Sequence, residues 1–466
     1  MRRRAAAGRP DDLLHAAMTM DHEAFSRRLR RNRLTRRDAL WLFGAGAAAA
    51  GLAGCATSPV TGERILVGMS EAEERQVDRQ VAPHQFSQDM GAIQDEAANR
   101  YVSGLGSRMD ELTQRPDMPY SYRVLNANYI NAYTFPGGAM GVTRGIVTEL
   151  DNEAELAALL GHEMGHVNAR HAAQRQGQAM LAQAAVVGLA VAASVADSSW
   201  GGLAAVGGQI GASALLASYS RDNEREADAL GQDYMVRAGY PAGGMVQLQS
   251  LLVRESKETP SLLETMFATH PMSSERLANA QRLAETKHAA SLKADPQRER
   301  FMDSTAGLRR LKPAIDACKR GEAAMGRKQL PQAQGEFAKA LATAPRDYPS
   351  NLLMARCLAA QGRQKDALRY AETARSIYPQ EAQAHKLTGV LQLAEKNPGA
   401  AAASFEQFDR LLPGDPGIAF LKGVAYEGAG NQRSAAESYA RFLRSGGQGK
   451  PAEYSMSRLK AWGYAR

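Results

Sequence analysis

The sequence contains few cysteines, few histidines and no long uninterrupted apolar run. Its 466 residues include three Cys and nine His. An apolar segment after the N-terminal region, 180–218, is rich in Ala, Gly and Val, but residues 197–202 divide it. Each half is too short and too poor in Leu and Ile to identify a membrane-spanning helix. We expect a buried helical hairpin there, with membrane insertion as the alternative.

Positive charge is concentrated at one end of the chain. The formal net charge is +8, yet residues 1–54 alone hold eleven Arg against five acidic residues, which leaves a nearly neutral body. A neutral body lacks the basic surface of a nucleic-acid-binding protein. We therefore predict no nucleic-acid partner. At this length about two to four domains are expected.

The N-terminus has the features of an export signal. A basic region ending in Arg36-Arg37 leads into a short apolar stretch that closes on Leu52-Ala53-Gly54-Cys55. This tetrapeptide resembles the lipobox of bacterial lipoproteins, which implies a signal peptide over 1–54 and lipid attachment at Cys55. The alternative is an uncleaved membrane anchor. Because Ala56 rather than Asp follows Cys55, we expect an outer-membrane lipoprotein that faces the periplasm.

The remaining cysteines, Cys318 and Cys357, are either a periplasmic disulfide or two small buried residues.

Residues 55–75 are expected to form a linker, and residues 70–114 are expected to be helical. Segments 120–126 and 131–148 are rich in Tyr, Val, Thr and Ile and predict strands, interrupted by Pro136-Gly137-Gly138. A further helix is expected from Asn152, which forms a capping box with Glu155, to beyond His171.

The C-terminal third repeats with a period of 34 residues. Several columns keep that spacing: an alanine column, a proline column and a column of small residues (Ala333, Ala367, Ala401, Ala435; Pro345, Pro379, Pro413; Gly321, Ala355, Gly389, Gly423). Aromatic residues follow three of the alanines by four positions (Phe337, Phe405, Tyr439). This is the tetratricopeptide pattern, and it predicts about three and a half to four repeats stacked as an all-α solenoid over 315–466.

The sequence His162-Glu163-Met164-Gly165-His166 lies in a strongly helical segment. Residues four apart share one helix face, so both imidazoles can bind one Zn²⁺, while Glu163 can reach a water molecule as general base. A catalytic zinc ion needs a third protein ligand. Glu224 is a candidate, with Asp228 one turn further on as the partner of an imidazole N–H. A solvated, charge-rich helix over 220–238 is the equally acceptable alternative. His171 is expected to be a surface or supporting residue rather than a ligand.

H-E-x-x-H followed by Glu224-Arg225-Glu226-Ala227-Asp228, with Asn131-Ala132-Tyr133 and Gly137-Gly138 upstream, resembles the gluzincin family of CaaX prenyl proteases and HtpX-type proteases. The resemblance implies an α+β metalloprotease domain over 76–300, mostly helical with a small sheet, and Glu224 as third zinc ligand. The repeats make the chain most similar to the beta-barrel assembly-enhancing proteases of this family. The lipobox and the segment 57–62 instead resemble its lipoprotein members.

The resemblance also suggests roles for three further features. Residues 131–142 would offer an edge strand on which an extended substrate pairs, with an ordinary buried strand as the alternative. His270, in the signature that ends at Arg276, would be able to occupy the open zinc position. Arg276 would orient Asp228 or contact the substrate.

Together these features predict a zinc endopeptidase, with one Zn²⁺ per chain, that cleaves misfolded or stalled outer-membrane proteins in the periplasm. The repeats would recruit unfolded clients or the outer-membrane assembly machinery. Two alternatives stay open at this point. One is a chaperone or scaffold that acts through its repeats with a closed or vestigial metal site, and the other is a protease embedded in the membrane through 180–218.

Overall fold

The computed structural model describes residues 54–194, 219–258, 270 and 274–465. The predicted signal peptide, apart from Gly54, and the predicted split at 197–202 therefore lie outside the described residues. The described residues form two compact units, one made of 54–74 with 170–194 and the other of 75–169 with 219–465. No helix among them is both long and apolar enough to cross a membrane.

The smaller unit contains a β-hairpin and a long helix. Strands β1 (Gly54–Thr57) and β2 (Arg64–Val67) pair antiparallel, and β2 packs against α8 (His171–Ser194). Ser58 Oγ accepts hydrogen bonds from the amides of Val60 and Thr61, which shapes the turn. The segment expected to be a linker is thus partly a hairpin, and its second strand lies against α8, where a Cβ on Gly177 would be 3.2 Å from Leu66 Cγ.

The larger unit contains a three-stranded sheet in the order β3-β5-β4. β3 (Ser121–Leu125) runs parallel to the central β5 (Ala139–Thr143), and β4 (Ala132–Thr134) pairs antiparallel with β5 and forms one edge. Gly138 turns the chain between β4 and β5 with φ of +97°. The predicted strand 131–148 ends early because Thr143 caps the short helix α6 (Arg144–Val147) by accepting a hydrogen bond from the Ile146 amide.

Helix α7 (Glu153–Asn168) begins where the capping pattern places it, with Asn152 accepting a hydrogen bond from the Glu155 amide. It does not continue past His171, because Arg170 adopts a left-handed conformation with φ of +60° and separates α7 from α8. The predicted helix 70–114 is likewise divided into α4 (Glu71–Gln88) and α5 (Glu96–Asp110) by left-handed Met90 and Gly91. Residues in that conformation cannot continue a right-handed helix.

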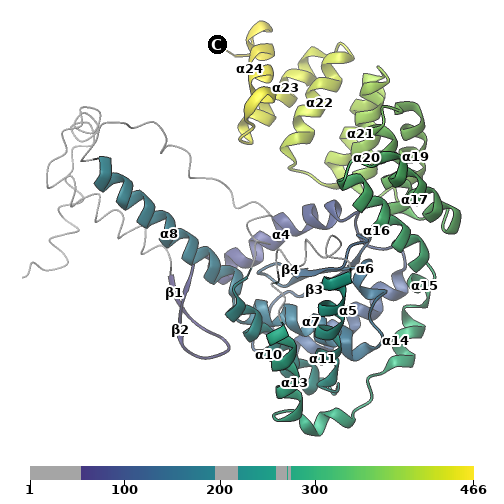
Figure 1. Cartoon of the computed structure of the whole chain (residues 1–466). Helices are drawn as coiled ribbons and strands as arrows, with labels where there is room; N and C mark the ends of the chain where they lie inside the picture. The colour runs from purple at the N-terminus through teal and green to yellow at the C-terminus, as the bar shows by residue number, and fades with distance from the viewer. Residues whose placement is uncertain (1–53, 195–218, 259–269, 271–273, 466) are drawn as a thin grey trace, which may run out of the picture. The chain divides into compact units, whose positions relative to one another are not determined.

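The remaining helices that precede the repeats in the larger unit pack on α7 or on one another (Figure 1). They are α10 (Arg221–Arg237), α11 (Gly243–Glu258), α13 (Ser274–Glu285), the 3-10 helix η2 (Ala289–Lys293), α14 (Arg298–Ser304) and α15 (Ala306–Arg309).

The repeats form four helix pairs and a final helix. The pairs are α16 (Lys312–Gly326) with α17 (Leu330–Thr343), α18 (Tyr348–Ala360) with α19 (Gln364–Ile377), α20 (Ala382–Ala394) with α21 (Pro398–Leu411), and α22 (Pro416–Gly428) with α23 (Gln432–Arg444), followed by α24 (Gly449–Ala461). Successive helices are antiparallel neighbours (Figure 1). The architecture expected from the sequence, a mostly helical domain with a small sheet before an all-α repeat region, is confirmed.

Complementary side-chain sizes explain the 34-residue period. A Cβ atom on Gly321 would lie 2.4 Å from the ring of Phe337, and a Cβ on Gly389 would lie 2.6 Å from the ring of Phe405. Each aromatic ring on the second helix of a pair therefore occupies the space above a glycine on the first. In the second repeat the ring is replaced by buried Ala371, and the small position is accordingly Ala355.

Buried polar contacts join the repeats to the sheet-containing part of the larger unit. Arg144 Nη1 lies 2.6 Å from Asp347 Oδ1, and both side chains are almost fully buried. Asp347 also caps α18 by accepting a hydrogen bond from the Ser350 amide. Cys318 and Cys357 are buried free thiols rather than a disulfide. Burial raises the pKa of Cys318 to about 12, so this thiol is unreactive.

Candidate active site

Two helices carry most of the candidate site. α7 is buried along its whole length and presents His162, Glu163 and His166. α10 presents Glu224 and Asp228, and it begins at a reciprocal capping box between Ser220 and Asn223. Because Glu224 lies in the first turn of α10, the helix dipole and free amides there favour its carboxylate.

Small residues let α7 and α10 approach closely enough for these side chains to meet. A Cβ on Gly161 would lie 2.7 Å from Gly231 O, and a Cβ on Gly165 would lie 2.8 Å from the Ala227 Cα. Such distances leave no room for any side chain. The backbone of each helix therefore lies directly against the other, and the histidines on α7 face the carboxylates on α10.

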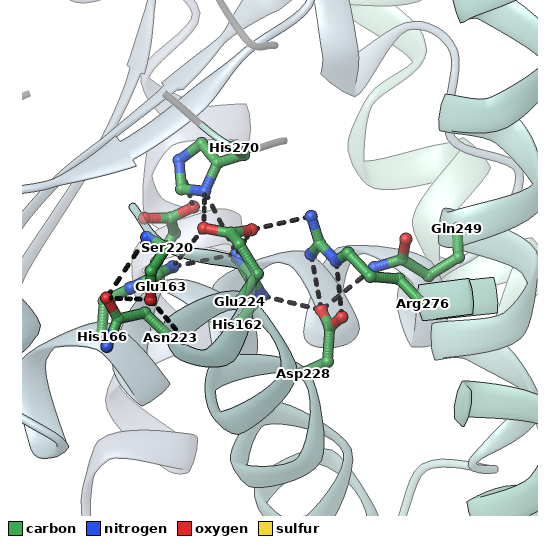
Figure 2. Close-up of polar contacts among 10 residues, drawn as sticks. All are labelled: His162, Glu163, His166, Ser220, Asn223, Glu224, Asp228, Gln249, His270 and Arg276. Atoms are coloured by element: carbon green, nitrogen blue, oxygen red, sulfur yellow. Dashed lines mark hydrogen bonds and ion pairs between the residues drawn. The ribbon is translucent and has the colours of Figure 1, made fainter. Parts of the chain in front are cut away.

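Four donor groups converge in this region: His162, His166, Glu224 and His270, all buried, with ligand atoms within 4.8 Å of one another (Figure 2). The two helical imidazoles meet with their Nε2 atoms 3.1 Å apart. Glu224 Oε2 lies 3.5 Å from His162 Nε2, and Glu224 Oε1 lies 3.4 Å from His166 Nε2.

These separations fit a tetrahedral ion. A zinc ion bound at about 2.0–2.1 Å keeps its ligand atoms about 3.3 Å from one another in tetrahedral geometry. His270 Nδ1 completes such a set, because it lies 3.3 Å from His162 Nε2 and 3.1 Å from Glu224 Oε1. Imidazole nitrogen and carboxylate oxygen are also the donor types that zinc prefers among these residues. The four side chains therefore have the chemistry and spacing of a zinc site.

A second group of side chains holds the donors in place. His162 Nδ1 lies 2.9 Å from Asp228 Oδ1, which orients the ring so that Nε2 points at the other donors. Arg276 binds Asp228 in a bidentate manner at 2.7 Å for both contacts, and its Nη1 lies 2.7 Å from Glu224 Oε2. Gln249 Nε2 donates to Asp228 Oδ1 at 3.0 Å. Figure 2 shows Arg276 and Gln249 on the side of Asp228 away from the histidines.

Burial and neighbouring charge set the protonation of the carboxyls. Burial would raise the pKa of Glu224, but the surrounding histidines, His270 first, outweigh it and hold that pKa well below its ordinary value. At Asp228 burial is likewise outweighed, here by the Arg276 guanidinium, and the pKa is lowered. Glu163 differs, because burial dominates and raises its pKa. Two carboxylates are thus kept ionised beside one that holds a proton more readily.

Comparison with known proteins identifies the larger unit's first half. Residues 96–284 match the model of Peptidase family M48, and residues 324–391 match that of a tetratricopeptide repeat. This part of the chain is therefore similar to the M48 peptidases. The donor helices α7 and α10, His270 and Arg276 all fall inside it.

Curated relatives carry related names. The chain is 30% identical over 228 residues to the beta-barrel assembly-enhancing protease of Yersinia pestis. The aligned region covers 47% of this chain and 46% of that protein. Its identity to the Escherichia coli K12 protein of the same name is 30%, over 41% of this chain and 40% of that protein. Metalloprotease YcaL of E. coli K12 is 32% identical over 34% of this chain and 59% of its own length. The chain thus spans less than half the length of the assembly-enhancing proteases that it matches.

Tyr219 also belongs to this site, although the sequence did not predict it. Tyr219 is buried and its ring stacks on His166, with centroids 4.0 Å apart and an interplanar angle of 20°. It immediately precedes Ser220, the N-cap of α10, where an apolar residue is an ordinary helix-entry feature. Nothing in the local sequence therefore distinguishes its contact with a ligand from simple packing.

The residues expected to bind substrate lie in and beside β4. Ala132 and Tyr133 belong to β4, Asn131 precedes it, and Gly137 and Gly138 form the turn after it. β4 packs against α7, the helix that carries Glu163. The Tyr133 hydroxyl donates to Asp89, so its ring is part of the packing around the sheet. Asn131 Oδ1 is buried and has no hydrogen-bond partner among the described residues.

Two other candidates lie elsewhere. His171 is buried at the start of α8 and is not among the converging donors that the structure describes. Cys55 lies in β1 as an exposed free thiol. Its exposure permits modification, while residues 1–53, the predicted signal peptide apart from Gly54, lie outside the described residues.

Proposed function

We propose that the protein is a zinc-dependent endopeptidase of the bacterial envelope that hydrolyses misfolded or stalled outer-membrane proteins. The observation that carries the proposal is the set of four buried donor atoms at tetrahedral separations with Glu163 beside them. The M48 match and the relatives named metalloprotease support the reaction type. Relatives named for beta-barrel assembly support the substrate class.

His162, His166 and Glu224 would hold the metal, with Asp228 fixing the His162 ring. When bound, zinc supplies Lewis-acid polarisation of a peptide carbonyl and lowers the pKa of water to about 7. Glu163 is the general base, since it adjoins His162 and its Oε2 is buried with no hydrogen-bond partner in the described part of the chain. Burial raises the pKa of Glu163. That shift suits a group that accepts a proton and returns it to the leaving amine.

His270 controls access in this proposal. As a fourth donor it would fill the ligand set of a bound zinc ion and leave no position for water or substrate, and its Nε2 lies 3.9 Å from Glu163 Oε1. Catalysis requires His270 to withdraw. The substrate would then pair with the edge strand β4, where backbone hydrogen bonding tolerates many sequences.

The first experiment measures zinc content and hydrolysis of unfolded casein by the purified protein. Wild type should bind one zinc ion and cleave casein. Glu163→Gln should keep the zinc, because Glu163 is not among the converging donors, and lose hydrolysis by at least about 100-fold. Equal, background-level cleavage by both proteins would contradict the peptidase assignment.

Location and partners form a second part of the proposal. Lipid attachment at Cys55 would anchor the protein in the outer membrane facing the periplasm, and the repeats would bind clients or the assembly machinery. Labelling with a radioactive fatty acid and membrane fractionation test the anchor. Wild type should carry label and sediment with outer membranes, whereas Cys55→Ser should carry none. An unlabelled wild type would remove the lipoprotein assignment.

A scaffold or chaperone with a permanently closed metal site is the second candidate, and the four-donor set favours it. His270→Ala separates the two functions. A peptidase held in a resting state should cleave casein faster after this change, with zinc still bound by the other three donors. A scaffold should show no cleavage in either form, and Glu163→Gln should then support barrel assembly in cells as well as wild type does.

A further inference from the structure

A pocket of about 580 Å³ lies within the larger unit, away from the metal donors. Its walls come from α4, from the sheet and from the repeats. Three arginines line it, Arg75 and Arg79 one turn apart on α4 and Arg123 on β3. Apolar surface is supplied by Phe86 of α4 and by Leu411 and Leu412 at the end of α21.

The pocket has an excess of positive charge. Its two carboxylates are already engaged: Asp78 accepts hydrogen bonds from the amides of Gly137 and Ala139, both at 2.7 Å. Glu381 accepts from the Tyr348 hydroxyl at 2.7 Å, and burial raises its pKa. By contrast, the described residues supply no ion-pair partner for the three guanidiniums, and Arg79 and Arg123 are exposed. An anionic ligand would therefore meet unpaired guanidinium groups.

The apolar wall limits which anion fits. The Arg123 guanidinium lies 6.0 Å from the centre of the Phe86 ring, so charge and aromatic surface adjoin. Leu411 is half-buried, while Phe86 and Leu412 expose only 8% and 7% of their surface, and a small inorganic anion would leave this apolar part of the wall without a contact. A peptide segment that alternates carboxylates with apolar side chains would cover both kinds of surface.

The pocket is also placed to receive a chain from the active site. Gly137, which lines it, belongs to the turn directly after β4, and Asp78 ties that turn to α4. A peptide paired along β4 would pass over this turn as it leaves the strand.

We propose that this pocket binds acidic, apolar segments of polypeptide, with carboxylates on Arg75, Arg79 and Arg123 and apolar side chains on Phe86 and Leu412. The pocket thereby holds part of the substrate away from the metal donors, and substrates that carry such segments bind more tightly. The inference rests on the proposed peptidase function only in identifying the bound peptide as a substrate.

The test is fluorescence anisotropy with a short fluorescein-labelled peptide of alternating Glu and Leu, using the full chain carrying Glu163→Gln so that nothing is cleaved. Arg79→Glu and Arg123→Glu should each weaken binding at least about fivefold, as expected for reversing one exposed ion pair. Arg433→Glu, at an exposed arginine of α23 that is paired with Glu437 and lies outside the pocket lining, is the control and should leave binding unchanged. Because all three residues lie at the surface, circular dichroism should show intact folds.

Several results would overturn the inference. They are equal binding of a Lys-Leu peptide, unchanged affinity in both pocket variants, or an equal loss in Arg433→Glu. Binding of phosphatidylglycerol vesicles but not of the peptide would also refute it. Its failure is distinguishable from failure of the proposed function, since peptide binding is measured without hydrolysis. If wild type cleaved casein but did not bind the peptide, the proposed role of the pocket would be refuted and the proposed peptidase function would still be supported.

Discussion

The close contact between α7 and α10 makes a quantitative prediction about Gly231. An alanine Cβ at this position would lie 2.6 Å from His162 N and 2.7 Å from Gly161 C, whereas ordinary contacts begin at 3.4 Å. The atoms in the way are backbone, so relief requires the two helices to separate by about 0.8 Å. Ligand positions in a working metal site tolerate about 0.5 Å. Gly231→Ala should therefore displace Glu224 from the two histidines.

We expect zinc affinity to fall by about 10–100-fold, which is the usual effect of disturbing the support of a metal ligand. The zinc-free protein should also lose about 1–3 kcal/mol of unfolding free energy, because the change overpacks a buried contact. A chelator competition titration measures the first quantity and urea denaturation the second.

Gly335→Ala is the control. Gly335 lies exposed in α17 with no atom within 4 Å of an added Cβ, so alanine there should stabilise by about 0.5–1 kcal/mol and leave zinc binding unchanged. If Gly231→Ala bound zinc within about twofold of wild type and cleaved casein normally, the approach of the helices would not be what places the ligands.

Three further predictions concern other contacts. Arg276→Ala leaves Asp228 charged and buried without its bidentate partner, so zinc affinity in a chelator titration should fall by about 10-fold or more. Gly389→Val drives a side chain into the Phe405 ring and should cost about 1–3 kcal/mol in urea denaturation without changing zinc content, since the contact lies in the repeats. Arg144→Met should lower the free energy of unfolding by about 3–5 kcal/mol near neutral pH, because it leaves the buried Asp347 carboxylate without its ion-pair partner. Burial raises the pKa of Asp347, but Arg144 outweighs burial and lowers that pKa below its ordinary value. The stabilisation that this ion pair gives wild type is therefore fully present above the unfolded-state pKa of about 3.9. It is lost as the pH falls through the lower pKa of the folded state. The stability difference between Arg144→Met and wild type should accordingly narrow in acid, and a constant difference down to low pH would contradict this account.

Local sequence patterns determined the elements that depend on local rules. The H-E-x-x-H spacing places two imidazoles on one face of any helix that contains it, and Asn152 with Glu155 marks where that helix begins. The 34-residue period predicted the repeats because three of the four helix pairs reuse the same contact between a glycine and a facing aromatic ring, at Gly321, Gly389 and Gly423. Expectations failed where a single backbone conformation decided the outcome. Left-handed Arg170 ended a helix that composition alone would continue, and the Thr143 cap replaced the end of a predicted strand.

The convergence of Glu224, His270 and Arg276 on the histidine pair was decided only by tertiary structure. Glu224, His270 and Arg276 lie 62, 108 and 114 positions after His162 in the chain. From spacing alone, Glu224 was equally acceptable as a metal ligand and as a solvated surface residue. Only the family resemblance favoured the ligand role. What brings it to the histidines is the contact of two glycine-bearing helix faces, a property of the pair that neither segment displays alone. The stacking of Tyr219 on His166 and the arginine-lined pocket have the same origin, since each needs side chains from elements that meet only after folding.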